Sequence, residues 1–177
     1  MSKIIVLDRD GVINEDSDAY IKSADEWQPV PGSIEAIKAL KQAGWTVAIA
    51  TNQSGIKRGY YGHKALTEMH QKLQALLGGD RVDWISFAPY LAEDNSPARK
   101  PGVGMLSAIE QRFNLKLAGA PMVGDTLADI RVAKAKSMQP YLVKTGKGLR
   151  TLASKEAVLA DVPVYENLQA VVEALLK

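Results

Sequence analysis

The segment Ile4-Ile5-Val6-Leu7-Asp8-Arg9-Asp10-Gly11-Val12 decides the fold class of this chain. Its four consecutive apolar residues predict a strand that is buried on both faces, as strands are in a parallel sheet. The aspartates that follow stand at the carboxyl end of that strand. Because ligands bind beyond the carboxyl ends of strands in open α/β sheets, the segment also indicates which edge of the sheet carries the site.

The rest of the chain alternates short apolar runs with amphipathic stretches, which indicates βαβ units. We therefore expect an α/β fold with three layers, Rossmann-like, in which helices cover both faces of a mostly parallel sheet. Residues 12–32 lack a helical period and are expected to form a loop or hairpin over the end of the sheet. Further strands are expected over 45–50, 84–88, 120–123, 141–143 and 162–165, and helices over 33–42, 64–77, 103–113, 129–137 and 167–176. The helix over 64–77 is expected to bury Leu66, Met69, Leu73 and Leu76.

Composition and charge limit the class of protein. The chain has 177 residues, of which 46% are hydrophobic, and this suits one globular domain over 1–177. A formal net charge of +2 and the lack of a long apolar run give no reason to expect nucleic acid or a membrane as a partner. The apolar run near the N-terminus is too short for a signal peptide, so a cytoplasmic location is expected. Cysteine is absent, which excludes disulfides, thiolate catalysis and cysteine-ligated zinc.

Acidic side chains are expected to converge at the edge of the sheet. Asp8 and Asp10 lie two residues apart, so in an extended segment their side chains share a face. Asp125 adds a carboxylate from the end of another strand, while Thr51 and Lys100 add a hydroxyl group and a positive charge. Converging carboxylates repel one another unless a cation lies among them, and oxygen ligands of this kind favour magnesium.

A count of charges supports a bound metal. We take Asp8 and Asp125 as ionised, Asp10 as a neutral acid and the substrate phosphate as a dianion. The negative charges are then matched only when magnesium, Lys100 and Arg99 are all present. An unmatched pair of charges ~4 Å apart costs about 4 kcal/mol at an effective dielectric constant of 20.

Four motifs in order resemble those of the haloacid dehalogenase superfamily of phosphohydrolases, over nearly the whole chain. They are Asp8 to Val12, Thr51-Asn52, Lys100-Pro101, and Gly124-Asp125 with Asp129. A narrower resemblance is to the D-glycero-D-manno-heptose 1,7-bisphosphate 7-phosphatases, which act in bacterial lipopolysaccharide biosynthesis. The histidinol-phosphate phosphatases are a sister group with similar motifs. The narrower resemblance rests on the stretches 8–14, 51–59, 99–105, 123–129 and 143–148.

The resemblance implies a mechanism. Asp8 would be the nucleophile that forms an aspartyl-phosphate, and Asp10 would be the general acid and then the general base. Thr51 would hold phosphoryl oxygens, and Lys100 would neutralise charge on the transferring group. Magnesium would be bound by the carboxylates of Asp8 and Asp125 and by the backbone carbonyl of Asp10.

The spacing of the motifs leaves no room for a large cap domain, so short loops are expected to set specificity. The expected substrate is a small sugar phosphate, and the chain is expected to act as a monomer. The planar fork of Arg99 suits a second phosphate or sugar hydroxyls. The residues expected to contact substrate are Arg9, Asp16, Ser17, Asp18, Ala19, Asn52, Gln53, Ser54, Arg99 and Thr126.

One departure from the resembled family concerns zinc. Many members bind zinc through Cys and His in the loop before the Arg-Lys-Pro motif, but residues 87–98 contain neither, so we expect no structural zinc. Asp129 is interpreted as a charge that favours a helix N-terminus rather than as a metal ligand. His63 and His70 are expected at the surface. A solvated face is expected for Lys134, Lys136, Lys144 and Lys147.

Two alternatives stay open at the level of sequence. The same chemistry could act on histidinol phosphate or on another small sugar phosphate. A different class is a phospho-accepting signalling domain without turnover, because receiver domains also pair acidic residues with a lysine on a doubly wound sheet. Asp10 argues against that class, since a receiver needs no acid for a leaving group.

Overall fold

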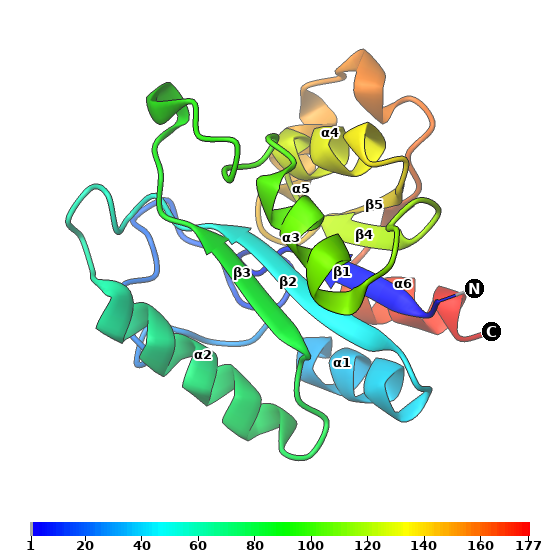
Figure 1. Cartoon of the computed structure of the whole chain (residues 1–177), viewed down its shortest axis with the longest axis horizontal. Coiled ribbons are helices and arrows are strands. Elements are labelled where there is room, and N and C mark those ends of the chain that lie inside the picture. The colour runs from blue at the N-terminus through cyan, green and yellow to red at the C-terminus, as the bar shows by residue number, and fades with distance from the viewer. Residues whose placement is uncertain (1) are drawn as a thin grey trace.

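The computed structural model, which describes residues 2–177, has a single six-stranded sheet between two layers of helices (Figure 1). The strand order is β3-β2-β1-β4-β5-β6, and every pairing is parallel. This confirms the expected α/β fold. The strands are β1 (Ile4–Leu7), β2 (Thr46–Asn52), β3 (Trp84–Ala88), β4 (Pro121–Gly124), β5 (Gln139–Val143) and β6 (Val164–Tyr165).

Helices α1, α2 and α6 cover one face of the sheet, and α3 and α4 cover the other (Figure 1). The sequence did not predict the short helix α5, and residues 12–32 form a loop as expected. Within residues 2–177, no helix is both long and apolar enough to cross a membrane. The helices are α1 (Ser33–Gln42), α2 (His63–Leu77), α3 (Gly104–Phe113), α4 (Leu127–Ala135), α5 (Gly148–Ala153) and α6 (Leu168–Leu175), with 3-10 turns at Ala92–Asp94 and Ala157–Leu159.

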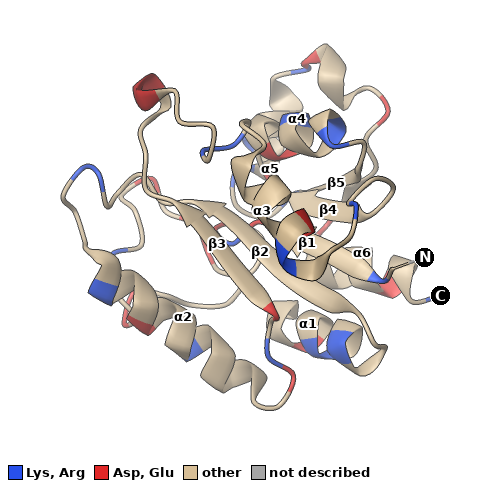
Figure 2. Ribbon diagram, in the orientation of Figure 1, with Lys and Arg blue, Asp and Glu red and all other residues tan. Residues whose placement is uncertain are grey.

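Strand β1 forms the centre of the core. Its side chains alternate between faces, so Ile5 and Leu7 pack in the cluster under α1, α2 and α6, while Ile4 and Val6 pack under α3 and α4. All four are at most 1% exposed. Within residues 2–177, no strand contains a charged residue, and the charges lie on helices and loops (Figure 2). The prediction of a strand buried on both faces is confirmed.

Helix α4 begins two residues before the expected start. The side chain of Thr126 accepts a hydrogen bond from the N–H of Asp129 (3.4 Å), and Asp129 Oδ2 accepts one from the N–H of Thr126 (3.2 Å). This reciprocal pair is a capping box, which satisfies N–H groups of the first turn. The interpretation of Asp129 as a charge at a helix N-terminus is therefore confirmed.

Helix α2 buries a slightly different stripe from the predicted one. Leu66, Met69, Leu73 and Leu77 are buried, whereas Leu76 is 42% exposed. Leu77 lies eleven positions after Leu66, which is close to three turns of ~3.6 residues, so the two side chains share a face. The prediction for Leu76 was wrong because that position is rotated away from this face.

Neighbouring leucines of α2 test this helical phase. Leu77→Ala should lower the free energy of unfolding by about 2–5 kcal/mol, because it opens a cavity in the core. Leu76→Ala should change it by less than about 1 kcal/mol, and it serves as the matched control. Urea unfolding of both variants measures the difference. Equal losses would contradict the assigned phase.

Candidate active site

The site lies where the order of the strands reverses. Strand β1 pairs with β2 on one side and with β4 on the other, so the loops after β1 and β4 diverge from a crevice at the carboxyl edge. Such switch points are where ligands bind in open α/β sheets. A cavity of about 380 Å³ opens here. It is lined by Asp8, Asp10, Ser17, Asp18, Tyr20, Asn52, Ser54, Arg99, Lys100, Asp125, Thr126, Ala128 and Lys147.

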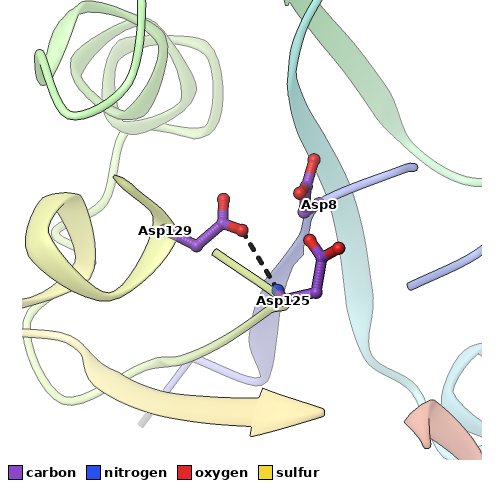
Figure 3. A group of neighbouring side chains, drawn as sticks. All are labelled: Asp8, Asp125 and Asp129. Atoms are coloured by element: carbon purple, nitrogen blue, oxygen red, sulfur yellow. Dashed lines mark hydrogen bonds between the residues drawn. The ribbon is translucent and has the colours of Figure 1, made fainter. Parts of the chain in front are cut away.

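Three buried carboxylates converge beside this cavity (Figure 3). Asp8, Asp125 and Asp129 each offer an oxygen within 4.8 Å of the others. Asp129 Oδ2 also accepts the N–H of Asp125 at 3.2 Å. Burial, reinforced by the charge of Asp129, raises the pKa of Asp8 well above its usual value and raises the pKa of Asp125 to about 7. The cluster therefore disfavours full ionisation in the absence of a further cation.

Lys100 supplies the positive charge of the cluster. Its Nζ lies 2.7 Å from the carbonyl oxygen of Ala50, 2.7 Å from Asp129 Oδ1 and 3.0 Å from Asp8 Oδ1. Its backbone is held by Asn52, which donates to the carbonyl of Lys100 (3.1 Å) and accepts its N–H (3.0 Å). Burial opposes the charge of Lys100, but the carboxylates of Asp129 and Asp8 outweigh it and raise the pKa of the ammonium group.

The donor set fits a divalent cation. Asp125 Oδ1 is buried without a hydrogen-bond partner, while Oδ2 accepts the N–H of Lys147 at 2.8 Å. Both oxygens of Asp129 are already engaged, Oδ1 by Lys100 and Oδ2 by Thr126. Asp8 and Asp125 therefore have the oxygens best placed to accept a cation. Ligands that are all oxygen suit magnesium.

Asp10 is held as a carboxylate. Its Oδ1 accepts hydrogen bonds from Arg9 (2.7 Å) and Asn14 (2.8 Å), and its Oδ2 accepts one from Gln53 (2.8 Å). Burial raises the pKa of Asp10, but the guanidinium charge of Arg9 and these donors outweigh burial and lower it. The charge count took Asp10 as neutral with a phosphate bound, whereas in the protein without substrate these contacts favour the ionised form.

Six of the predicted substrate contacts line the cavity and four do not. Arg9 is fully buried, because it follows Asp8 in an extended segment and points away from the face that Asp8 shares with the cavity. Gln53 is buried beneath the cavity, and Asp16 pairs with Lys147 Nζ at 2.5 Å. Ala19 is exposed outside the lining. The residues that line the cavity as predicted are Ser17, Asp18, Asn52, Ser54, Arg99 and Thr126.

Thr51 is likewise absent from the residues that line the cavity. It is fully buried, and its Oγ1 accepts a hydrogen bond from Gln53 Nε2 at 2.9 Å. Strand β2 continues to Asn52, so Thr51 is still a strand residue with its side chain packed against the sheet. The predicted contact of the Thr51 hydroxyl group with a phosphoryl oxygen stays a prediction.

Lys147 is the principal site residue that the sequence prediction missed. It was expected on a solvated face, but it lines the cavity and its N–H binds Asp125. Gly11 and Gly146 allow the loop of Lys147 to pack closely against Asp125, because neither position has room for a side chain. A Cβ on Gly11 would lie 2.1 Å from Asp125 Oδ2, and one on Gly146 would lie 2.4 Å from Gly11 Cα. The signal was Gly146, within a stretch that resembled the family but received no role.

The loop over residues 87–98 is closed by its own hydrogen bonds. Asp94 Oδ2 accepts the N–H of Leu91 (2.8 Å), and Arg99 donates to the carbonyl of Tyr90 (3.1 Å). The second contact ties the loop to Arg99, which lines the cavity. The expectation that this loop binds no zinc stays a prediction.

The fold and the acidic site define a phosphohydrolase-like protein, and a family comparison agrees. A family model described as haloacid dehalogenase-like hydrolase matches residues 3–135, so the chain belongs to that family. A D-glycero-beta-D-manno-heptose-1,7-bisphosphate 7-phosphatase of Pseudomonas aeruginosa is 49% identical to this chain. The alignment covers 98% of each of the two proteins. A relative of the same name from Bordetella bronchiseptica is 46% identical, over 99% of this chain and 98% of its own.

A solved structure is similar throughout. The D,D-heptose 1,7-bisphosphate phosphatase of Bordetella bronchiseptica, complexed with magnesium and phosphate, superposes with a TM-score of 0.94. The two chains are 46% identical over 98% of each. These relatives confirm the predicted resemblance, and the match to a hydrolase family leaves the signalling alternative without support.

The raised pKa of Asp125 predicts a pH-dependent stability. The folded protein binds more protons than the unfolded chain between about pH 4, near the usual aspartate pKa, and about pH 7. In EDTA, the free energy of unfolding contributed by Asp125 should therefore fall as pH rises through this range. Asp125→Asn should remove that contribution.

Urea unfolding of the wild-type protein and of Asp125→Asn at about pH 5 and pH 7 measures it. The pKa of His70 is lowered to about 4, so its contribution to the free energy of unfolding rises with pH. This contribution is present in both proteins. The difference between the two proteins therefore reports the titration of Asp125 together with the part of the pKa shift of Asp8 that the charge of Asp125 causes. An identical pH dependence in both would contradict the assignment.

Proposed function

We propose that the chain hydrolyses the 7-phosphate of D-glycero-β-D-manno-heptose 1,7-bisphosphate through an aspartyl-phosphate on Asp8. The observation that carries the proposal is the buried cluster of Asp8, Asp125 and Asp129 beside the cavity, in which Lys100 pairs with Asp8 and Asp129. The choice of sugar is supported by relatives that bear this name and match over nearly their whole length.

The contacts of Asp8 suit it to nucleophilic attack. Lys100 and the N–H of Arg9 both contact Oδ1, at 3.0 Å and 2.7 Å, which orients the carboxylate and leaves Oδ2 for attack on phosphorus. A bond from Oδ2 to phosphorus forms while the bond from phosphorus to the sugar oxygen breaks. Magnesium, when bound by Asp8 and Asp125, supplies positive charge that stabilises the transferring phosphoryl group.

Asp10 moves the protons in both half-reactions. It gives a proton to the departing sugar oxygen, and then takes one from the water that attacks the aspartyl-phosphate. An approaching phosphate dianion raises the pKa of a nearby carboxylate, so substrate favours the protonated form that the first step needs. The contacts with Arg9 and Gln53 favour the ionised form that the second step needs.

Cationic side chains on the cavity wall suit the second phosphate. Arg99 and Lys147 line the same cavity as Asp8. A bisphosphate held by its distal phosphate places the other phosphate at the nucleophile without a cap domain. We further propose that the chain is a single domain that works as a monomer in the cytoplasm. The proposal of a single domain is supported by a relative that this chain matches over 98% of its length.

Aspartate substitutions and a substrate panel test the proposal. With magnesium, the protein should release phosphate from the heptose 1,7-bisphosphate in preference to histidinol phosphate and common hexose phosphates. Asp8→Asn should abolish turnover because it removes the nucleophile, and Asp10→Asn should lower kcat by roughly 10²–10⁴-fold. EDTA should abolish activity in the wild-type protein. Preference for another substrate would overturn the sugar assignment, and retained activity in Asp8→Asn would overturn the mechanism.

The distal phosphate has its own test. Arg99→Met and Lys147→Met should each raise KM for the bisphosphate by roughly 10–100-fold, the worth of one charge-assisted hydrogen bond. They should change KM for the heptose 7-monophosphate by much less. Steady-state phosphate release on both substrates measures this. Equal effects on the two substrates would show that these cations do not bind the second phosphate.

A further inference from the structure

The side chain of Arg9 links helix α2 to Asp10. Arg9 is fully buried, and its Nη2 and Nε lie 2.7 Å and 3.3 Å from Asp10 Oδ1. Its Nη1 lies 3.2 Å from His70 Nε2 and 3.6 Å from Met69 Sδ. His70 is thus half-buried and engaged, contrary to the expectation that it lies at the surface.

The chemistry of this contact assigns the state of the imidazole. A guanidinium group can only donate hydrogen bonds, so Nε2 of His70 must accept, and the ring proton must lie on Nδ1. Burial and the nearby charge of Arg9 both lower the pKa of His70, to about 4. The ring therefore stays neutral and keeps its acceptor at neutral pH.

We propose that His70 is a positioning residue for the proposed phosphatase reaction, acting through Arg9 to hold the carboxylate of Asp10 in place for proton transfer. The proposal rests on the proposed role of Asp10. His70 is the strongest hydrogen-bond acceptor that Nη1 of Arg9 contacts, since Met69 sulfur is a weak one. Without His70, the buried Nη1 would keep only the weak Met69 sulfur as a partner, and the lost hydrogen bond favours rotation of the guanidinium group.

Rotation of Arg9 would remove the guanidinium group from Asp10 Oδ1 and leave only Asn14 Nδ2 on that oxygen, at 2.8 Å, so the carboxylate would be less firmly held. The other oxygen accepts Gln53 Nε2 at 2.8 Å, and Gln53 is in turn held by the hydroxyl of Tyr61. The carboxylate is thus fixed from two sides, with His70 at the end of one chain of contacts and Tyr61 at the end of the other. Displacement by about 1 Å of a catalytic group can cost on the order of 10²-fold in rate.

The test compares His70→Leu with His70→Gln. Gln keeps an acceptor near the position of Nε2, whereas Leu keeps the volume and removes the acceptor. His63→Leu and His63→Gln are matched controls, because His63 is the other histidine of α2 and is exposed. Each variant is assayed on the heptose bisphosphate and on p-nitrophenyl phosphate, whose leaving group departs without a proton.

We expect His70→Leu to lower kcat on the sugar substrate by roughly 10–100-fold with little change in KM. The pre-steady-state burst of p-nitrophenol should stay within about threefold of wild type, because its departure needs no general acid. His70→Gln and both His63 variants should resemble wild type on both substrates. A loss in His70→Leu that is the same for both substrates, or no loss, would overturn the proposal.

Arg9→Lys keeps the test decisive if His70→Leu fails to fold. Lysine retains the charge but cannot bridge Asp10 and His70 at once, so it should show the same loss confined to the sugar substrate. Wild-type behaviour of Arg9→Lys on the sugar would overturn the proposal. Failure of the proposed function is distinct, since the wild-type protein would then release no phosphate from the sugar bisphosphate. In that case the comparison is repeated with the best alkyl phosphate of the panel.

Discussion

The arrangement of the site depends on the contacts that the buried ammonium group of Lys100 makes with its neighbours. The ammonium group joins the carbonyl end of β2 at Ala50 to Asp129 of α4 and to Asp8 after β1, so it connects elements on both sides of the switch point. Without it, the carboxylates would be buried without an opposite charge, which is strongly destabilising. The same contact therefore holds the loops together and orients the nucleophile.

The acidic residues of the site fall into two electrostatic classes. Burial and mutual repulsion raise the pKa values of Asp8 and Asp125, so these two need a cation before both are ionised. Neighbouring donors and cations lower the pKa values of Asp10 and Asp129 despite burial. Carboxylates whose environments push their pKa values apart can take different roles in one reaction. In the proposed mechanism, a bound cation would favour the ionised forms of Asp8 and Asp125, and substrate would favour the protonated form of Asp10.

The features that could be predicted from the sequence are those that a local pattern of apolar and polar residues determines. Strand β1, the order of the motifs and the cluster at the carboxyl edge follow from apolar runs that end in polar residues. The inward direction of Thr51 depends on where β2 ends, which periodicity does not resolve. The contact of Arg9 with His70 spans 61 positions and leaves no local signal, whereas the only local sign of Lys147 was the neighbouring Gly146, which packs against Gly11. Thr126 and Asp129 have the spacing of a capping box, so the start of α4 is encoded locally in the sequence.

The central claim is that Asp8 becomes phosphorylated during turnover. The most direct measurement is rapid acid quench of the protein mixed with magnesium and the heptose 1,7-bisphosphate, then borohydride reduction and peptide mass spectrometry. Reduction converts an aspartyl-phosphate to homoserine. The account predicts homoserine at position 8 in the wild-type protein and none in Asp8→Asn. Full turnover with no modification at Asp8, or with the modification at another carboxylate, would contradict it.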